Sequence, residues 1–139
     1  MNHRHIPLLF LLLSCTAVLT ACQRDAAPVS PQEQQRLAGE RAFEVCSYCH
    51  TATPGGAHKT GPNLFAVYGR RAASAPGYRY STALQQADLV WNEETLDAYL
   101  RHPSVRVPGT RMVNATVDPS RRAQVIAYLK SLSPPAAVP

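Results

Sequence analysis

Three side chains in one pentapeptide have the types and spacing to attach a cofactor covalently. Residues 46–50 read Cys-Ser-Tyr-Cys-His, so two thiols stand three positions apart and an imidazole follows directly. This is the attachment pattern of a c-type haem, in which each thiol adds to one vinyl group of the porphyrin and the histidine binds the iron. On this interpretation Cys46 and Cys49 hold the haem and His50 is the proximal ligand. The alternative is a disulfide or CxxC redox pair that happens to precede a histidine.

A second iron ligand must come from elsewhere in the chain, which has five histidines and two methionines. Met1 is excluded by its position. Met112 ends the stretch Pro-Gly-Thr-Arg-Met at 108–112, a stiff turn between two expected helices. Methionines more often fill gaps in a core, but a thioether on a loop far along the chain from His50 suits coordination from the opposite face. His/Met ligation saturates the iron and raises its potential, which favours electron transfer over oxygen chemistry.

The first residues are typical of an export signal. A positive charge and two histidines precede an apolar run over 6–21, which matches a charged n-region followed by an h-region. The run is short for a membrane span, which takes ~20 apolar residues. It ends in Leu-Thr-Ala-Cys at 19–22, which resembles the bacterial lipobox. We therefore expect a lipoprotein signal peptide over 1–21 and a lipidated Cys22 with its tether over 22–30. An ordinary cleaved signal and an uncleaved anchor are the alternatives.

The cysteine count agrees with this assignment. Of the four cysteines, Cys15 leaves with the signal peptide, Cys22 takes lipid, and Cys46 and Cys49 take haem. No thiol is left for a structural disulfide, although an exported compartment would permit one. A CxxC oxidoreductase would also need a βαβ context, and no strand pattern surrounds Cys46.

The mature domain is predicted over 31–133 as an all-α unit with long loops, followed by a flexible tail over 134–139. Its first helix begins after Ser30, with proline at the first helical position and Glu33 completing a capping box. Gly39 interrupts this helix and indicates close packing against another helix. Caps and breakers indicate the other helical segments: short turns at 64–68 and after Ser81, a helix from Asn92 to Pro103, and one from Asp118 to Pro134.

Composition and charge limit the choice of fold and partner. The 139 residues suffice for one domain, and 7% aromatics with 12 prolines indicate a small protein core. A covalently held porphyrin would supply the centre of such a core. The formal net charge of +5 comes mainly from arginine, because the chain has only two lysines. This excess favours acidic protein partners or anionic surfaces. Nucleic acid is disfavoured, because no nucleic-acid-binding motif is present and the N-terminus indicates export.

These segments together resemble a class I cytochrome c of the mitochondrial and related bacterial type. The resemblance extends over about 39–132 and has several independent parts in the order typical of the family. They are the pentapeptide at 46–50, His-Lys-Thr-Gly-Pro-Asn-Leu at 58–64, Gly-Arg at 69–70, Ala-Pro-Gly-Tyr-Arg-Tyr at 75–80, Trp-Asn-Glu-Glu-Thr-Leu at 91–96, Tyr-Leu at 99–100, Pro103, Pro-Gly-Thr-Arg-Met at 108–112 and Ile-Ala-Tyr-Leu at 126–129. It implies an all-α fold of short helices and long loops wrapped around one covalent haem.

The resemblance also implies roles for single residues. His50 would be the proximal and Met112 the distal ligand of the iron. The carbonyl of Pro62 would accept the other ring N–H of His50, which fixes the tautomer. Tyr99 would place its hydroxyl near the Met112 sulfur. Three further residues resemble the groups that hold the buried haem propionates, with plain packing as the alternative for the last two: Arg70, Tyr80 and Trp91.

Two features depart from the family pattern. Asn114 stands where the mitochondrial pattern has an aromatic residue beside the haem edge, which should leave that edge wetter. Arginine replaces most of the lysines of the family's docking face. The basic residues concerned, some of them merely solvated surface, are Lys59, Arg70, Arg71, Arg79, Arg101, Arg106 and Arg111.

The sequence thus predicts a monohaem one-electron carrier, not an enzyme, tethered by lipid to the periplasmic side of a bacterial membrane. Its expected partners are redox proteins with acidic docking surfaces, among them membrane oxidases or reductases, and we expect a monomer. Gln23 is not the aspartate that retains lipoproteins in the inner membrane of enteric bacteria, so the choice of membrane stays open. Two alternatives are a dedicated electron-transfer subunit of one oxidase or reductase, and a haem peroxidase or gas sensor with an open iron site.

Overall fold

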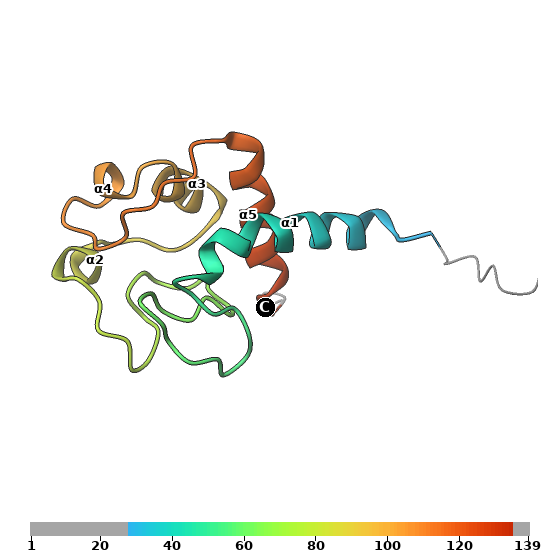
Figure 1. Cartoon of the computed structure of the whole chain (residues 1–139). Helices are drawn as coiled ribbons and strands as arrows, with labels where there is room; N and C mark the ends of the chain where they lie inside the picture. The colour runs from blue at the N-terminus through green and yellow to red at the C-terminus, as the bar shows by residue number, and fades with distance from the viewer. Residues whose placement is uncertain (1–27, 135–139) are drawn as a thin grey trace, which may run out of the picture.

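A computed structural model describes residues 28–134 of the chain and shows a helical fold with long loops (Figure 1). Within this range there are five helices: α1 (Pro31–Ser47), α2 (Thr82–Gln86), α3 (Glu93–Arg101), α4 (Pro103–Arg106) and α5 (Pro119–Ser131). The described residues hold a single isolated β-bridge, between Arg71 and Val90, and no longer strand. The signal peptide predicted over 1–21, Cys22 and most of the tether lie outside this range, as does the tail from residue 135.

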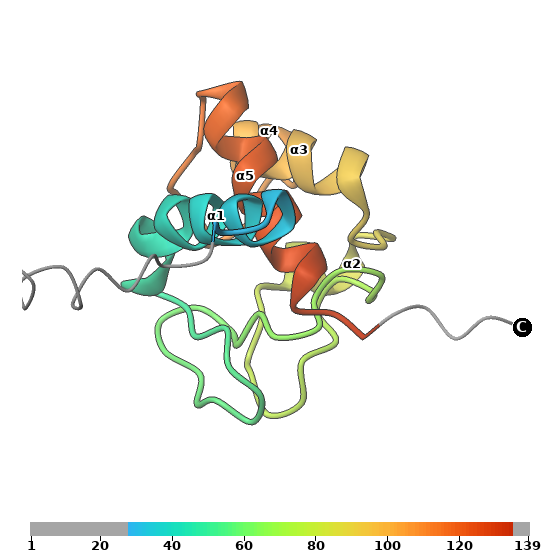
Figure 2. The same ribbon diagram turned by 90° about the vertical axis from the view of Figure 1, so that its right-hand side faces the viewer.

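The two longest helices cross at the centre of the molecule, and the loop after α1 forms the lower half in both views (Figures 1 and 2). Gly39 lies at this crossing. A Cβ added there would stand 2.7 Å from both the Gln124 carbonyl oxygen and Tyr128 Cβ, so the backbones can approach this closely only without a side chain. Phe43 and Tyr128 continue the contact, with ring centroids 5.2 Å apart. The predicted close packing at Gly39 is confirmed.

Helix starts follow local side-chain chemistry, with one correction. Ser30 caps α1 by accepting a hydrogen bond from the Glu33 backbone N–H at 3.2 Å. The predicted capping box is incomplete, because the Glu33 carboxylate binds the Arg36 guanidinium at 2.7 Å instead of returning to Ser30. A complete box forms at α3, where Asn92 and Thr95 each accept from the other's backbone N–H at 2.9 Å.

Three predicted segments differ in detail. The helical turn expected over 64–68 is a pair of tight turns, because Ala66 has a φ of 53° and this left-handed conformation interrupts a right-handed helix. Pro103 ends α3 as predicted but also begins the short α4. The last helix ends at Ser131, three residues before the proline that was expected to stop it.

The core joins the helices to the loops beneath them. Its buried side chains are Ala42, Phe43, Val67, Leu89, Trp91, Leu96, Tyr99, Leu100, Val107, Val125, Ile126 and Leu129. Between residues 28 and 134, no helix has both the length and the apolar character that a membrane crossing requires.

Candidate cofactor site

A cavity of about 560 Å³ opens between the helices and the loops, within the range of small-molecule and cofactor sites. It brings together side chains from distant parts of the chain. All nine residues predicted to hold the cofactor or its iron line it: Cys46, Cys49, His50, Pro62, Arg70, Tyr80, Trp91, Tyr99 and Met112. A larger groove of about 900 Å³ between α1, α3 and α5 contains none of them.

The two thiols stand where α1 gives way to the loop. Backbone bonds to the Cys46 carbonyl oxygen, 3.1 Å from Cys49 N and 2.9 Å from His50 N, turn the chain at the end of the helix. Cys46 and Cys49 are not joined in a disulfide, and both side chains are partly buried. Burial raises the pKa of the Cys46 thiol, while the positive charge of Arg121 lowers it in part.

The imidazole of His50 has one nitrogen committed to the protein. Its Nδ1 lies 2.8 Å from the Pro62 carbonyl oxygen. A carbonyl oxygen can only accept, so Nδ1 carries the proton and Nε2 keeps its lone pair. Burial lowers the pKa of this imidazole, which keeps it neutral near pH 7. A neutral imidazole with an unshared nitrogen is the state that binds a metal.

Gly61 lies against this imidazole; it belongs to the segment 58–64 of the family pattern, but no role was predicted for it. A Cβ at this position would lie 2.6 Å from His50 Nδ1 and 2.7 Å from Nε2. Its backbone N–H donates to the Cys49 carbonyl oxygen at 2.7 Å. The ring of His50 therefore needs a glycine here. The Gly-Pro pair at 61–62, eleven and twelve residues after His50, is the only sequence signal of this contact.

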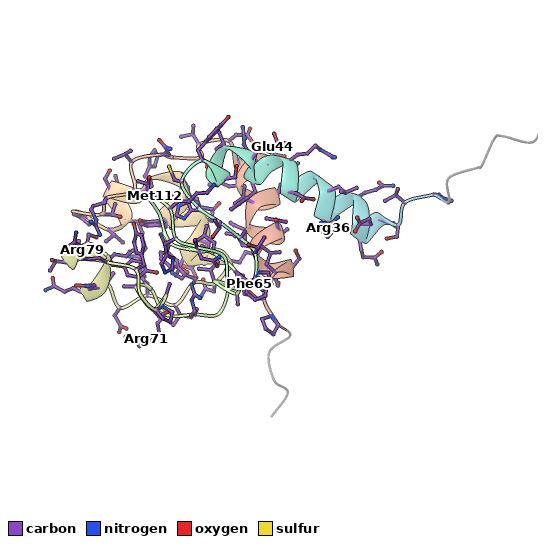
Figure 3. All side chains as sticks on the ribbon, turned by 60° about the horizontal axis from the view of Figure 1, so that its bottom comes forward. Arg36, Glu44, Phe65, Arg71, Arg79 and Met112 are labelled. Carbon is purple, nitrogen blue, oxygen red and sulfur yellow. The ribbon has the colours of Figure 1, made fainter. Side chains whose placement is uncertain are left out.

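Met112 enters the cavity from the loop between α4 and α5 (Figure 3). On this side the Tyr99 hydroxyl lies 2.6 Å from Oγ1 of Thr110. The Met112 backbone N–H also approaches that oxygen, at 3.4 Å. Thr110 is a site residue that sequence reasoning missed. The expected contact of Tyr99 with the Met112 sulfur stays a prediction.

The polar end of the cavity holds an unsatisfied donor. Arg70 Nε is buried and has no hydrogen-bond partner within the described part of the chain, while its Nη1 reaches only the Phe65 carbonyl oxygen at 3.4 Å. A buried guanidinium N–H without a partner is costly, so this cavity suits a ligand that brings an anionic oxygen. Tyr80 lies nearby with its hydroxyl 3.3 Å from Ala75 N, and burial raises the pKa of this phenol.

Trp91 contributes an apolar wall. It is buried, and its ring centroid lies 5.1 Å from that of Tyr99. The thiols, the imidazole and the thioether line the same cavity as this aromatic wall and the unsatisfied arginine. The residues present therefore fit a haem, whose flat body is apolar and whose propionates are anionic.

One edge of the cavity is open to water. Asn114 lines the cavity and is exposed, and the adjacent Val113 is 86% exposed. Two basic side chains, Arg71 and Arg79, lie on the side of the molecule that carries Met112, away from Arg36 on α1 (Figure 3).

Known proteins are similar to the domain that holds this cavity. The family model described as Cytochrome c matches residues 37–133. Cytochrome c of Sesamum indicum is 45% identical over 94 residues, which cover 66% of this chain and 85% of that protein. Cytochrome c2 of Blastochloris viridis is 37% identical over 110 residues, which cover 78% of this chain and 87% of that protein.

Two solved structures are also similar. Cytochrome cH from Methylobacterium extorquens has a TM-score of 0.64 at 39% identity, covering 69% of this chain and 97% of that one. Cytochrome c2 from Rhodospirillum centenum has a TM-score of 0.68 at 33% identity, covering 71% of this chain and 98% of that one. The predicted fold class is thereby confirmed.

Proposed function

The chain belongs to the cytochrome c family, and we propose that it carries single electrons between redox proteins on the periplasmic side of a bacterial membrane. Members of the family are electron-transfer proteins with one covalently bound haem c, which confirms the predicted cofactor and the prediction that the chain is not an enzyme. One observation carries the proposal for these residues. Cys46, Cys49, His50 and Met112 come from two distant segments and line one cavity.

The residues at and just after the end of α1 would attach the haem. Cys46 and Cys49 would form the two thioether bonds, and Nε2 of His50 would bind the iron. The bound haem supplies reversible one-electron exchange between ferric and ferrous iron. Pro62 keeps the proton on Nδ1 through its 2.8 Å contact, which holds the ring orientation and increases electron donation from Nε2.

Met112 would supply the second iron ligand from the loop between α4 and α5. Because the protein would hold both the imidazole of His50 and this thioether, the ligand set would not need to change on electron exchange. Little structural reorganisation would then oppose electron transfer. The site also gains a higher potential than imidazole alone would give, because a thioether favours the reduced metal.

The propionates would lie at the polar end of the cavity. Arg70 offers the buried Nε that lacks a partner, and a guanidinium bonded to a carboxylate is among the stronger pairs in proteins. Tyr80 and Trp91 line the cavity with it and can donate from their hydroxyl and ring N–H. Arg70, which was predicted both among the propionate-holding groups and among the basic docking residues, would then serve the cofactor rather than the docking surface.

Docking would use the exposed basic residues around the open edge. Two of the predicted set are already paired, Arg71 with Asp88 at 2.9 Å and Arg101 with Asp97 at 2.5 Å. Arg79 and Arg111 are exposed and lie together, because the Arg111 guanidinium donates to the Arg79 carbonyl oxygen. They would attract acidic partners such as membrane oxidases or reductases at salt-dependent rates.

A small anionic oxidant tests this role directly. The reduced protein, with its haem incorporated, is mixed with ferricyanide and the oxidation rate is followed at increasing salt. We expect rapid reversible oxidation, slowed several-fold in Arg79→Gln and Arg111→Gln and slowed in wild type by salt. Arg36→Gln is the matched control, because Arg36 is an exposed arginine on α1 at the other end of the molecule (Figure 3). Protein that takes up haem but does not cycle would contradict the proposal.

The membrane anchor rests on the lipobox that ends at Cys22. Several acyl chains on that residue would hold the protein to a bilayer where one chain would bind only reversibly. Replacement of Cys22 by Ser should move the haem protein from the membrane fraction to the soluble fraction without changing its absorption spectrum. A variant that stays with the membrane would contradict lipid anchoring while leaving the electron-carrier role intact.

A further inference from the structure

Arg122 on α5 is the one buried charged side chain in the described part of the chain, at 5% exposed. Its Nε donates to Asp97 Oδ1 on α3 at 2.7 Å. Its Nη1 donates to two backbone carbonyl oxygens, those of Thr116 at 2.9 Å and Val117 at 2.7 Å. One buried cation therefore ties two helices to the loop that follows Met112.

That loop, residues 111–117, is here called the Met112 strap. Its middle residues, Val113 to Ala115, are exposed. Their backbone N–H groups make no backbone hydrogen bond within the described part of the chain. Beyond them, the Thr116 N–H donates to the Leu100 carbonyl oxygen at 2.7 Å. The strap is thus held at its two ends, near Thr110 on one side and by α3 and Arg122 on the other.

The chemistry of Arg122 makes the second attachment hard to break. A buried guanidinium is tolerated only when its charge is paired and its N–H groups are bonded. Withdrawal of the strap would remove two of the acceptors of this cation, and water would have to replace them. A lysine could not replace it fully, because an ammonium lacks the planar fork that serves a carboxylate and two carbonyls together.

We propose that Arg122, held in place by Asp97, is a positioning residue that keeps the Met112 strap closed and so limits how often the thioether leaves the iron. The inference rests on the proposed role of Met112 as the distal ligand. Opening of the strap would leave the iron accessible to outside ligands from that side. The Asp97–Arg122 pair therefore sets the balance between a closed electron carrier and an open, ligand-binding form.

The test uses the ferric, haem-loaded protein and imidazole as the outside ligand. Loss of the red absorption band that sulfur ligation gives to ferric haem reports the displacement of Met112. We expect Arg122→Lys to bind imidazole about tenfold or more tightly than wild type, which corresponds to about 1.4 kcal/mol in the opening equilibrium. Asp97→Asn keeps the contacts of Arg122 with the two carbonyl oxygens. Its imidazole affinity should therefore lie between those of wild type and Arg122→Lys.

Arg101→Gln is the matched control. Arg101 also binds Asp97, at 2.5 Å, but its side chain makes no hydrogen bond to the strap within residues 28–134. Its imidazole affinity should stay within twofold of wild type. If Arg122→Lys and Asp97→Asn behave like Arg101→Gln, the inference is overturned while the proposed function stands. Wild-type protein without the sulfur band would overturn the proposed role of Met112 and this inference together.

Global destabilisation needs its own control. Gly39→Ala should weaken the α1–α5 crossing without touching the strap. Imidazole binding should therefore stay near that of wild type in this variant, even where its unfolding free energy is as low as that of Arg122→Lys. An equal gain in imidazole affinity in both variants would show that general loosening is the cause, and would overturn a specific role for Arg122.

Discussion

The hydroxyl of Tyr99 and Oγ1 of Thr110 lie 2.6 Å apart, which links α3 to the turn that carries Met112. Tyr99 is buried, and burial raises the pKa of its phenol. A buried hydroxyl needs a hydrogen-bond partner. The hydroxyl of Thr110, two residues before Met112, is that partner. The turn on one side of the proposed iron ligand is therefore fixed by a side-chain bond.

Thr110→Val should cost stability, because it leaves the Tyr99 hydroxyl buried without its partner. We expect the free energy of unfolding to fall by about 1–3 kcal/mol, measured by urea denaturation of the haem protein. Thr82→Val, at an exposed position on α2, is the control and should be nearly neutral. In a Tyr99→Phe background the Thr110→Val change should cost less. An equal cost in both backgrounds would show that the hydroxyl pair is not the cause.

Gly61→Ala should disturb the proximal ligand. The added methyl would overlap the His50 ring, 2.6 Å from Nδ1, so the ring must move or the loop must shift. We expect a smaller fraction of protein with the absorption spectrum of axially saturated haem. Gly55→Ala is the control: an added Cβ there meets nothing within 4 Å, so it costs only the backbone strain of a positive φ, about 1–2 kcal/mol. Equal spectra in the two variants would contradict the proposed contact.

Gly39→Ala tests the helix crossing, where two effects have opposite signs. Alanine gains about 0.5–1 kcal/mol over glycine inside a helix. Overpacking against Gln124 and Tyr128 should cost about 1–3 kcal/mol, so the net change is a loss of stability in denaturant unfolding. A more stable variant would show that α1 and α5 are not in tight contact at this residue.

Acid should weaken the Asp97 contacts in a defined pH window. Hydrogen bonds from Arg122 and then Arg101 lower the pKa of Asp97 below its ordinary value of 3.8. A carboxyl with a lower pKa in the folded state contributes stability above the unfolded pKa and loses it as pH falls through the folded value. The difference in unfolding free energy between wild type and Asp97→Asn should therefore shrink below about pH 3.8. A difference that stays constant through this range would contradict the ion pair.

Features that depend on residues close together in the sequence could be predicted. Asn92 and Asp118 cap their helices as predicted, because a cap depends on a side chain and a backbone N–H three residues away. The pentapeptide at 46–50 and Met112 could be proposed as haem-binding residues because that chemistry depends on residue type and spacing. They line one cavity, and their roles at the iron stay predictions.

The sequence did not predict which of two possible partners a side chain binds, nor which residues distant in the sequence become neighbours in the fold. Glu33 binds Arg36 rather than Ser30 because two partners were within reach and the charged one is stronger. Ala66 takes a left-handed conformation that its residue type does not signal. Asp97 and Arg122 are 25 residues apart, so only the packing of α3 on α5 makes them neighbours. Thr110 and Gly61 likewise have their roles through what the fold places beside them.

The central claim is that the chain holds one haem covalently, and that His50 and Met112 are the two protein ligands of its iron. An optical redox titration of wild type and Met112→Ala tests it most directly. We predict that both proteins keep their haem through denaturation, while the variant has a lower midpoint potential and binds carbon monoxide rapidly when reduced. Equal midpoints with equally slow carbon monoxide binding would show that Met112 does not hold the iron.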